Sequence, residues 1–225
     1  MADYQLKTTA DGSHTLYMPR IKEQYHSLNG AVTESMHVYI EHGYLFSGSL
    51  TPVVLEVGFG TGLNCLLTAL QAEKLKRDTT YRTLDNNLLP PEIIKQLNYD
   101  EILPGRAKSL FSAIHAIGWE EETSVSEYFK LQKIYADITK ADWRLKEAFN
   151  IIYYDAFGPD KQPEIWSETI FRKIFEMTMP EGILVTYSAK GEVRRRLAGV
   201  GFTMERVKGP PGKKEMLRGI KRSFN

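Results

Sequence analysis

A glycine loop and three acidic side chains are spaced as they would be around a nucleotide-like ligand. Residues 53–67 read VVLEVGFGTGLNCLL, with glycines at 58, 60 and 62 between an apolar run and a helix-like segment. Glycine permits positive φ and close approach of the backbone, and a helix N-terminus offers free N–H groups to a polar ligand. A dinucleotide-binding loop needs glycine at 63, where this chain has Leu63, so an NAD enzyme is a weaker alternative.

The three acids each stand near the end of a predicted strand, and they are Glu56, Asp85 and Asp137. Strand ends of a parallel sheet meet at one edge. The spacing Glu-x-Gly-x-Gly-x-Gly at residues 56–62 resembles the first motif of S-adenosylmethionine-dependent methyltransferases, and this resemblance implies that Asp85 binds two ribose hydroxyls and that Asp137 contacts adenine. Simpler roles are available: Asp85 could cap the next segment, Asp137 could cap a helix over 138–143, and Glu56 could bind its own loop. The loop and the acids together favour an adenosyl ligand.

A further carboxylate follows the strand in NIIYYDAFGPDKQPEIW, residues 150–166. Asp155 comes after four apolar or aromatic residues, so it should emerge from the buried sheet into a cleft. An alkyl amine, with a pKa of about 10.4, is protonated at neutral pH and has no lone pair for attack. A carboxylate here could orient such an ammonium group and accept its proton. Trp166 could stack on a flipped base, although a buried anchor is the more common role of tryptophan.

The residues named above lie in a predicted series of alternating strands and helices, which must bring them together. Buried strands are predicted at 52–58, 79–85, 130–137, 149–157 and 182–188, and helices at 61–76, 90–97, 107–117, 168–179 and 191–201. The order predicts an α/β fold with a doubly wound, mostly parallel sheet, ending in an antiparallel pair over 203–208 and 215–222. Residues 1–30 are predicted to form an irregular or hairpin cap, followed by a helix from Thr33 to Gly43. We therefore expect a cap over 1–50 and a core over 51–225.

Composition limits the class of protein. The 225 residues are 42% hydrophobic, enough for one substantial core. Cys65 is the single cysteine, which excludes an intrachain disulfide and a cysteine-rich zinc site. The sequence has no apolar run of the roughly 20 residues that span a bilayer and no signal-peptide pattern at its start, so we expect a cytoplasmic protein that does not engage a membrane.

The charge is unevenly distributed. Residues 190–225 hold eleven basic and three acidic side chains, a net charge of +8, whereas residues 1–189 carry −7. Such asymmetry indicates a polyanionic partner for the C-terminal part. A solvated helix face and a basic tail would explain it equally well.

Three stretches resemble a known family. EVGFGTGLN, YYDAFGPDKQPEIW and SAKGEVRRRLAGVGFTMERVKGPPGKKEML are similar to the methyltransferase domain of the bifunctional tRNA-modifying MnmC enzymes and to stand-alone proteins with that domain only. The resemblance covers nearly the whole chain. It implies a class I S-adenosylmethionine-dependent methyltransferase that converts 5-aminomethyl-uridine, or its 2-thio form, to the 5-methylaminomethyl product at the tRNA wobble position.

The resemblance also implies roles for individual residues. Asp155 matches the proposed catalytic carboxylate. The cofactor-binding set is Glu56, Gly58, Gly60, Gly62, Asn64, Asp85, Asp137 and Asp155, and the tRNA-binding set is Lys190, Arg194, Arg195, Lys213 and Lys214. The family more often has a glutamate after the second strand, where this chain has LDNNLLPP, so either Asp85 or Asn86 could hold the ribose. No flavin-dependent oxidase domain is present in these residues, and we expect another enzyme to supply the amine.

Two other functions remain open at this stage. An aminopropyltransferase of the spermidine-synthase type also activates an amine with a strand-end aspartate, but a cationic polyamine disfavours a basic surface. A catalytically inert tRNA- or nucleotide-binding module could keep the fold without the reaction. No metal site is expected: Glu34, His37 and Glu41 share a helix face, but His42 is predicted on another face.

Overall fold

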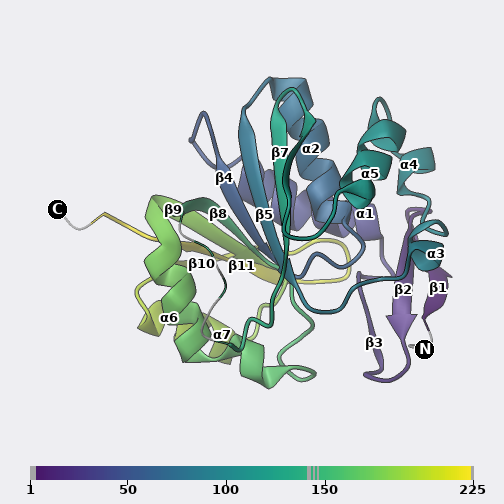
Figure 1. Cartoon of the computed structure of the whole chain (residues 1–225). Coiled ribbons are helices and arrows are strands. Elements are labelled where there is room, and N and C mark those ends of the chain that lie inside the picture. The colour runs from purple at the N-terminus through teal and green to yellow at the C-terminus, as the bar shows by residue number, and fades with distance from the viewer. Residues whose placement is uncertain (1–3, 141–142, 144, 146, 224–225) are drawn as a thin grey trace.

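A mixed eight-stranded sheet forms the centre of the computed structural model, which describes residues 4–140, 143, 145 and 147–223 (Figure 1). Its strand order is β10-β11-β9-β8-β4-β5-β7-β6. The strands are β4 (Val53–Val57), β5 (Thr79–Asp85), β6 (Glu122–Ser126), β7 (Phe129–Tyr135), β8 (Phe149–Tyr154), β9 (Thr178–Thr186), β10 (Thr203–Lys208) and β11 (Glu215–Ile220). Five neighbouring strands, β9, β8, β4, β5 and β7, are parallel, and β6 and β11 run antiparallel to their neighbours.

Helices cover both faces of this sheet. One face packs against η1, α2 and α5, and the other against α6 and α7 (Figure 1). The helical segments are α1 (Ala31–Ser35), the π-helix η1 (Met36–Tyr44), α2 (Leu63–Leu75), α3 (Pro91–Ile94), α4 (Tyr99–Ile102), α5 (Ala107–Ala116), the 3₁₀ segment η2 (Pro163–Trp166), α6 (Glu168–Met177) and α7 (Gly191–Gly199). The central strands are therefore buried on both faces, which explains their nearly continuous apolar sequences.

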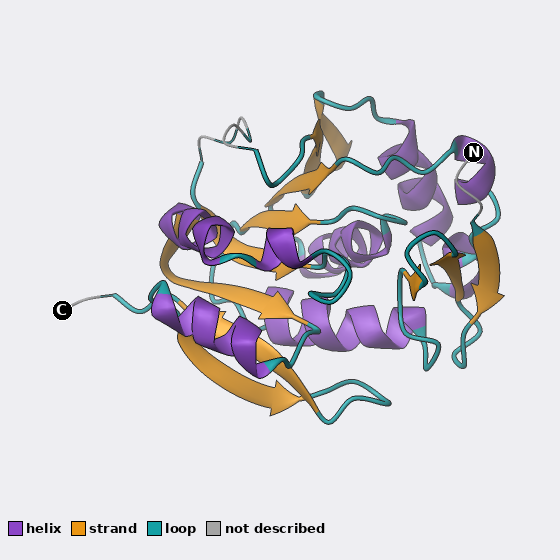
Figure 2. Cartoon of the chain, turned by 90° about the horizontal axis from the view of Figure 1, so that it is seen from below, coloured by secondary structure: helices purple, strands orange, loops and turns teal. Residues whose placement is uncertain are grey.

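A second, three-stranded antiparallel sheet lies at the N-terminal end of the chain. It consists of β1 (Gln5–Thr8), β2 (His14–Met18) and β3 (Glu23–Gln24) in that order. Figure 2 shows this small sheet at one end of the molecule, away from the C-terminus. The segment over 31–44 instead packs on the main sheet, where Val38, Ile40 and Tyr44 are fully buried in the core. The predicted division at residue 50 stays a prediction.

The strand order reverses beside β4. This strand pairs with β5 on one side and with β8 on the other, both in parallel. In doubly wound sheets, ligands bind at such a reversal, beyond the carboxyl ends of the strands. The glycine loop follows β4, Asp85 ends β5, and Asp155 follows β8, so the topology brings them to one edge.

The doubly wound, mostly parallel fold predicted from the sequence is confirmed, including the closing hairpin of β10 and β11. The strand predicted at 79–85 has those bounds in the structure. The helix predicted from Thr33 to Gly43 is wrong in its start and its type: it begins at Ala31 after Gly30 and continues as a π-helix to Tyr44. Thr33 is not its cap, because its hydroxyl donates to Asp11 at 2.8 Å.

Some short elements were not predicted. The region between 97 and 129 contains α4 and β6 in addition to α5, and the helix expected over 90–97 is limited to Pro91–Ile94. Residues 138–140 form a turn rather than a helix, and 141–142 of that expected helix lie outside the described residues. In the described part of the chain, no helix has the length and apolar character needed to cross a bilayer.

Candidate active site

A cavity of about 530 Å³ opens at the carboxyl edge of the sheet. Residues 23–27 of the N-terminal segment close one side, and loops after β4, β5, β7 and β8 form the rest. It contains most of the site residues expected from the sequence: Gly58, Gly60, Asn64, Asp85, Asp137 and Asp155. Gly62 and Glu56 do not line it.

The loop after β4 requires glycine for two reasons. Gly58 has φ +95°, and a Cβ there would lie 2.6 Å from the carbonyl oxygen of Asp155. Gly62 has φ +76° and precedes the first residue of α2. Positive φ at both positions lets the chain turn sharply from the strand into the helix. The backbone of the loop is thus exposed to the cavity with no side chain at Gly58.

Asp85 is held by backbone amides. Its Oδ2 accepts from the N–H of Gly60 at 2.9 Å, and its Oδ1 accepts from the N–H of Asn87 at 2.7 Å. Burial raises the pKa of Asp85, while these hydrogen bonds oppose the shift. The carboxylate therefore fixes the glycine loop to the end of β5, and both Asp85 and Asn86 line the cavity.

Asp137 stands two residues beyond β7. Its Oδ1 accepts from both the hydroxyl of Thr139, at 2.7 Å, and the N–H of Thr139, at 2.9 Å. These bonds hold the pKa of Asp137 below its ordinary value. The capping role considered from the sequence is thus present, as the cap of a turn, on a side chain that also lines the cavity.

Asp155 is bound by two side chains that come from distant elements. The hydroxyl of Tyr39, on η1, donates to its Oδ1 at 2.5 Å, and Nδ2 of Asn64, on α2, donates to its Oδ2 at 2.7 Å. Burial raises the pKa of Asp155 to about 7, although the two hydrogen bonds lower it. A carboxyl group that titrates near neutrality can accept a proton and release it again at physiological pH.

Glu56 lies behind Asn64. It is fully buried, and its Oε1 accepts from Nδ2 of Asn64 at 3.2 Å. Burial, together with the negative charge of Asp155, raises the pKa of Glu56 well above its ordinary value. The raised pKa favours the protonated form of Glu56, which contacts Asn64 by this hydrogen bond and does not line the cavity.

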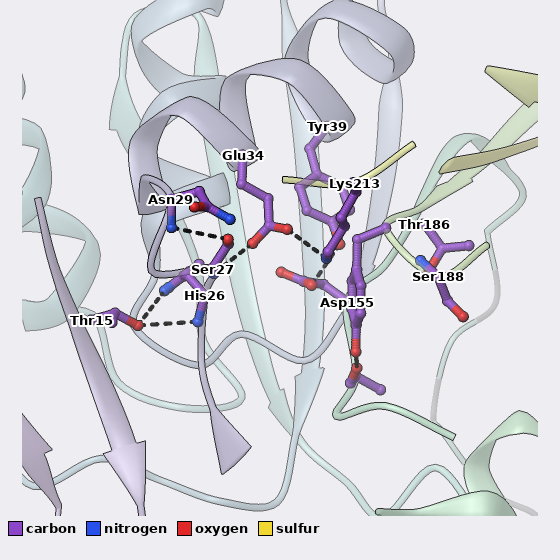
Figure 3. A network of polar contacts seen from close by, with 12 residues as sticks. Thr15, His26, Ser27, Asn29, Glu34, Tyr39, Asp155, Thr186, Ser188 and Lys213 are labelled. Atoms are coloured by element: carbon purple, nitrogen blue, oxygen red, sulfur yellow. Dashed lines mark hydrogen bonds and ion pairs between the residues drawn. The ribbon is translucent and has the colours of Figure 1, made fainter. Parts of the chain in front are cut away.

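An ion pair spans the cavity near Asp155. Figure 3 shows Glu34 and Lys213 approaching each other beside Asp155, and their Oε1 and Nζ atoms are 2.6 Å apart. The other oxygen of Glu34 accepts from the N–H of Ser27 at 2.8 Å. The ammonium of Lys213 also lies 4.2 Å from the centre of the Tyr187 ring. Glu34, Tyr39 and Tyr187 were not predicted as site residues, because no local spacing links them to the motifs after β4 and β8.

A second groove of about 420 Å³ adjoins the cavity and shares Glu23, Gly158, Tyr187 and Lys213 with it. Four lysines line it: Lys161, Lys190, Lys213 and Lys214. Lys190 pairs with Asp160. Three of the five expected tRNA contacts therefore gather here, whereas Arg194 and Arg195 lie on α7 and do not line the groove.

Trp166 lies in the core. It is 0% exposed, its Nε1 donates to the carbonyl of Phe157 at 2.8 Å, and its ring meets that of Tyr154 edge to face. This position is incompatible with stacking on a base, so of the two roles considered for Trp166 the structure shows the buried anchor. The 3₁₀ turn of η2 directs the indole under the loop instead. Tyr25 and Tyr187 are aromatic side chains that do line the cavity.

A model of the S-adenosyl-L-methionine-dependent methyltransferase family matches residues 107–222. The chain belongs to this family. Among curated relatives, the methyltransferase is 28% identical over 214 residues to the tRNA 5-methylaminomethyl-2-thiouridine biosynthesis bifunctional protein MnmC of Cupriavidus necator, and 30% identical over 210 residues to that of Ectopseudomonas mendocina. The alignments cover 89% and 87% of this chain but 32% of each relative, so the chain spans about a third of their length.

A solved structure, that of MNMC2 from Aquifex aeolicus, matches the whole methyltransferase chain. The TM-score is 0.81 at 23% sequence identity, and the match covers 100% of this chain and 72% of that one. This similarity shows that the two chains share the fold. The methyltransferase fold expected from the sequence is confirmed by it and by the family match.

Proposed function

We propose that the cavity binds S-adenosylmethionine and that Asp155 lies beside the transferred methyl group. Family membership supports the cofactor, and the volume of about 530 Å³ is within the range of small-molecule sites. When bound, the cofactor supplies a methyl group made electrophilic by a positively charged sulfonium. The acidic side chains of the cavity suit such a cation and the hydroxyls of its ribose.

The chain offers a separate group for each part of that cofactor. Gly58 and Gly60 line the cavity without a side chain, so they are proposed to let the ligand approach the backbone of the loop closely. Asp85 lines the cavity at the end of β5 and is proposed to bind the ribose. Asp137, which lines the cavity next to Ile138, is proposed to contact the adenine.

The acceptor is proposed to be a primary amine. An ammonium group beside Asp155 would bind its ionised carboxylate, lose a proton to it, and then have a lone pair for attack. Tyr39 and Asn64 each occupy one carboxylate oxygen, which fixes the orientation of the group that receives the proton. The observation that carries the proposal is the position of Asp155, at the strand reversal with a pKa of about 7.

The amine is proposed to be that of 5-aminomethyl-uridine, or its 2-thio form, at the wobble position of tRNA. The relatives that cover this chain are named for 5-methylaminomethyl-2-thiouridine biosynthesis in tRNA. The lysine-lined groove beside the cavity suits a phosphate backbone next to an inserted base. The net charge of +8 over residues 190–225 would strengthen this contact.

Transfer of labelled methyl from S-adenosylmethionine tests the proposal. The acceptors are tRNA carrying 5-aminomethyl-2-thiouridine, the same tRNA without the modification, and putrescine. Label in the aminomethyl tRNA alone is expected. If labelled cofactor binds but no tRNA gains label, the tRNA substrate is wrong. Transfer of an aminopropyl group to putrescine from decarboxylated S-adenosylmethionine would instead establish the aminopropyltransferase.

A further inference from the structure

Three potential metal ligands gather on the outer side of the π-helix. One donor atom each of His37, Glu41 and His42 lie within 4.8 Å of one another, and the described residues contain no other such group of three. In an α-helix, positions five apart point about 140° away from each other. Here the helix is bonded in the i→i+5 pattern, as in the 2.8 Å bond from Leu45 N–H to the carbonyl of Ile40. The π geometry brings His42 beside His37, which corrects the placement expected from the sequence.

The orientation of His37 is set by the backbone. Its Nε2 lies 2.8 Å from the carbonyl oxygen of Lys208, and a carbonyl only accepts, so Nε2 carries the proton. In the neutral ring, Nδ1 then has its lone pair free, 3.3 Å from Oε2 of Glu41. Two acceptors at this distance repel unless a proton or a cation lies between them. A histidine whose second nitrogen donates to a carbonyl is also the usual arrangement of a metal ligand.

His42 completes the set. Its ring meets that of His37 at a centroid distance of 4.7 Å. Arg218, a cation close enough to His42 to act on it electrostatically, is compensated by its ion pair with Glu205 at 2.8 Å. The local charge therefore does not prevent a cation from binding.

We propose that His37, Glu41 and His42 form a binding site for a divalent transition-metal ion, with zinc the best match. Two imidazoles and a carboxylate are common zinc ligands, and water can occupy the fourth position. Ligand atoms around tetrahedral zinc are about 3.4 Å apart. The pair of His37 and Glu41 already has this spacing at 3.3 Å, and the donor atom of His42 lies within 4.8 Å of both.

The ion would link successive turns of the helix that holds Tyr39 against Asp155. Through His37 it would also connect this helix to the end of β10, at Lys208. Bound zinc should therefore raise the melting temperature of the chain. This site is independent of the proposed methyl transfer, because none of its three side chains lines the cavity.

Calorimetric titration of the full chain with Zn²⁺, after removal of metal with a chelator, tests the site. One ion per chain is expected, with a rise in melting temperature that the chelator reverses. His42→Gln and Glu41→Gln should each weaken binding by at least about tenfold. The matched control is His14→Gln, since His14 also contacts a backbone carbonyl, that of Gln96 at 2.8 Å, but belongs to β2. It should bind zinc like the parent chain.

Two results would contradict the zinc site. If the parent chain binds no stoichiometric zinc, or if the His42 and Glu41 variants bind as the parent does, the site does not exist and a proton joins His37 to Glu41. Melting curves recorded without metal show whether each variant is folded. Glu41 is exposed, so Glu41→Gln keeps the test valid even if a histidine variant is destabilised.

Discussion

The two halves of the cavity hold their carboxylates in different ways. On the side of β5 and β7, Asp85 and Asp137 accept hydrogen bonds mainly from backbone amides and from residues close in sequence or on the adjoining loop. On the side of β8, Asp155 accepts from Tyr39 and Asn64, which are 116 and 91 positions away. The carboxylates of the first half are held by the loops next to them. The carboxylate of the second half is held by helices that the tertiary fold brings to it.

This difference separates binding from proton transfer. The pKa of Asp137 is lowered, so this side chain stays ionised as a fixed acceptor, and backbone hydrogen bonds oppose the rise that burial gives the pKa of Asp85. Asp155 has a pKa near 7 because burial costs its charged form more than two hydrogen bonds restore. A group poised near the working pH can exchange protons, whereas a strongly ionised one cannot. The local half is therefore suited to hold a cofactor, and the assembled half to activate an acceptor.

The largest effect is expected from Asp155→Asn. The amide cannot accept the proton of the ammonium, so kcat should fall about 10³-fold. Affinity for S-adenosylhomocysteine, measured by calorimetry, should change little, because the cofactor is proposed to be held mainly by the other half. The control is Asp78→Asn, which alters an exposed aspartate. Equal losses of kcat and of cofactor affinity in Asp155→Asn would remove the distinction between the halves.

The same substitution should stabilise the fold at high pH. The Asp155 carboxyl ionises near 3.8 in the unfolded chain and near 7 in the folded one. The contribution of Asp155 to the stability of the parent therefore falls as pH rises from about 4 to 7 and does not change further above that window. At pH 8 the variant should be about 2 kcal/mol more stable, roughly half the full linkage value because the side chain is partly exposed. Urea unfolding at pH 4 and pH 8 measures the gain, and an equal gain at both would contradict the raised pKa.

Asp85→Asn tests the half of the cavity that is proposed to bind the cofactor. It weakens the bond to Gly60 and the proposed contact with ribose, so cofactor affinity should fall about tenfold. At saturating cofactor, kcat should stay within about threefold of the parent value, since Asp85 takes no part in proton transfer. Steady-state kinetics with the cofactor concentration varied measures both effects. A loss confined to kcat would show that Asp85 acts on the reaction instead.

The groove should influence tRNA binding alone. Lys190→Gln combined with Lys214→Gln should raise KM for tRNA about fivefold, with a shallower dependence on salt, and leave kcat unchanged. The matched control is Lys74→Gln, an exposed lysine on α2 that does not line the groove. Unaltered KM and salt dependence would exclude the groove as a phosphate contact.

The elements that depend on local sequence could be predicted correctly. The strand over 79–85 and the glycine loop have periodic or steric patterns that determine them, and the acids at their ends follow from strand polarity. Contacts between segments that are distant in the sequence could not be predicted. Nothing near Tyr39 or Glu34 indicates that η1 packs over Asp155, and α- and π-helices share similar apolar spacing, so the grouping of His37 with His42 was hidden. Trp166 is a buried anchor, the more common of the two roles considered for it, because η2 places it beneath a loop.

The pH dependence of kcat for methyl transfer to aminomethyl tRNA, with parent chain and Tyr39→Phe compared, tests the central claim most directly. The parent rate should rise with pH to a plateau, with a midpoint near 7, because Asp155 must be ionised to accept the proton. Removing the hydroxyl that lowers the pKa of Asp155 should move the midpoint to higher pH. A midpoint near 10, or one that Tyr39→Phe does not move, would contradict the account. It would show that the ammonium group of the substrate loses its proton to solvent and that Asp155 is not its base.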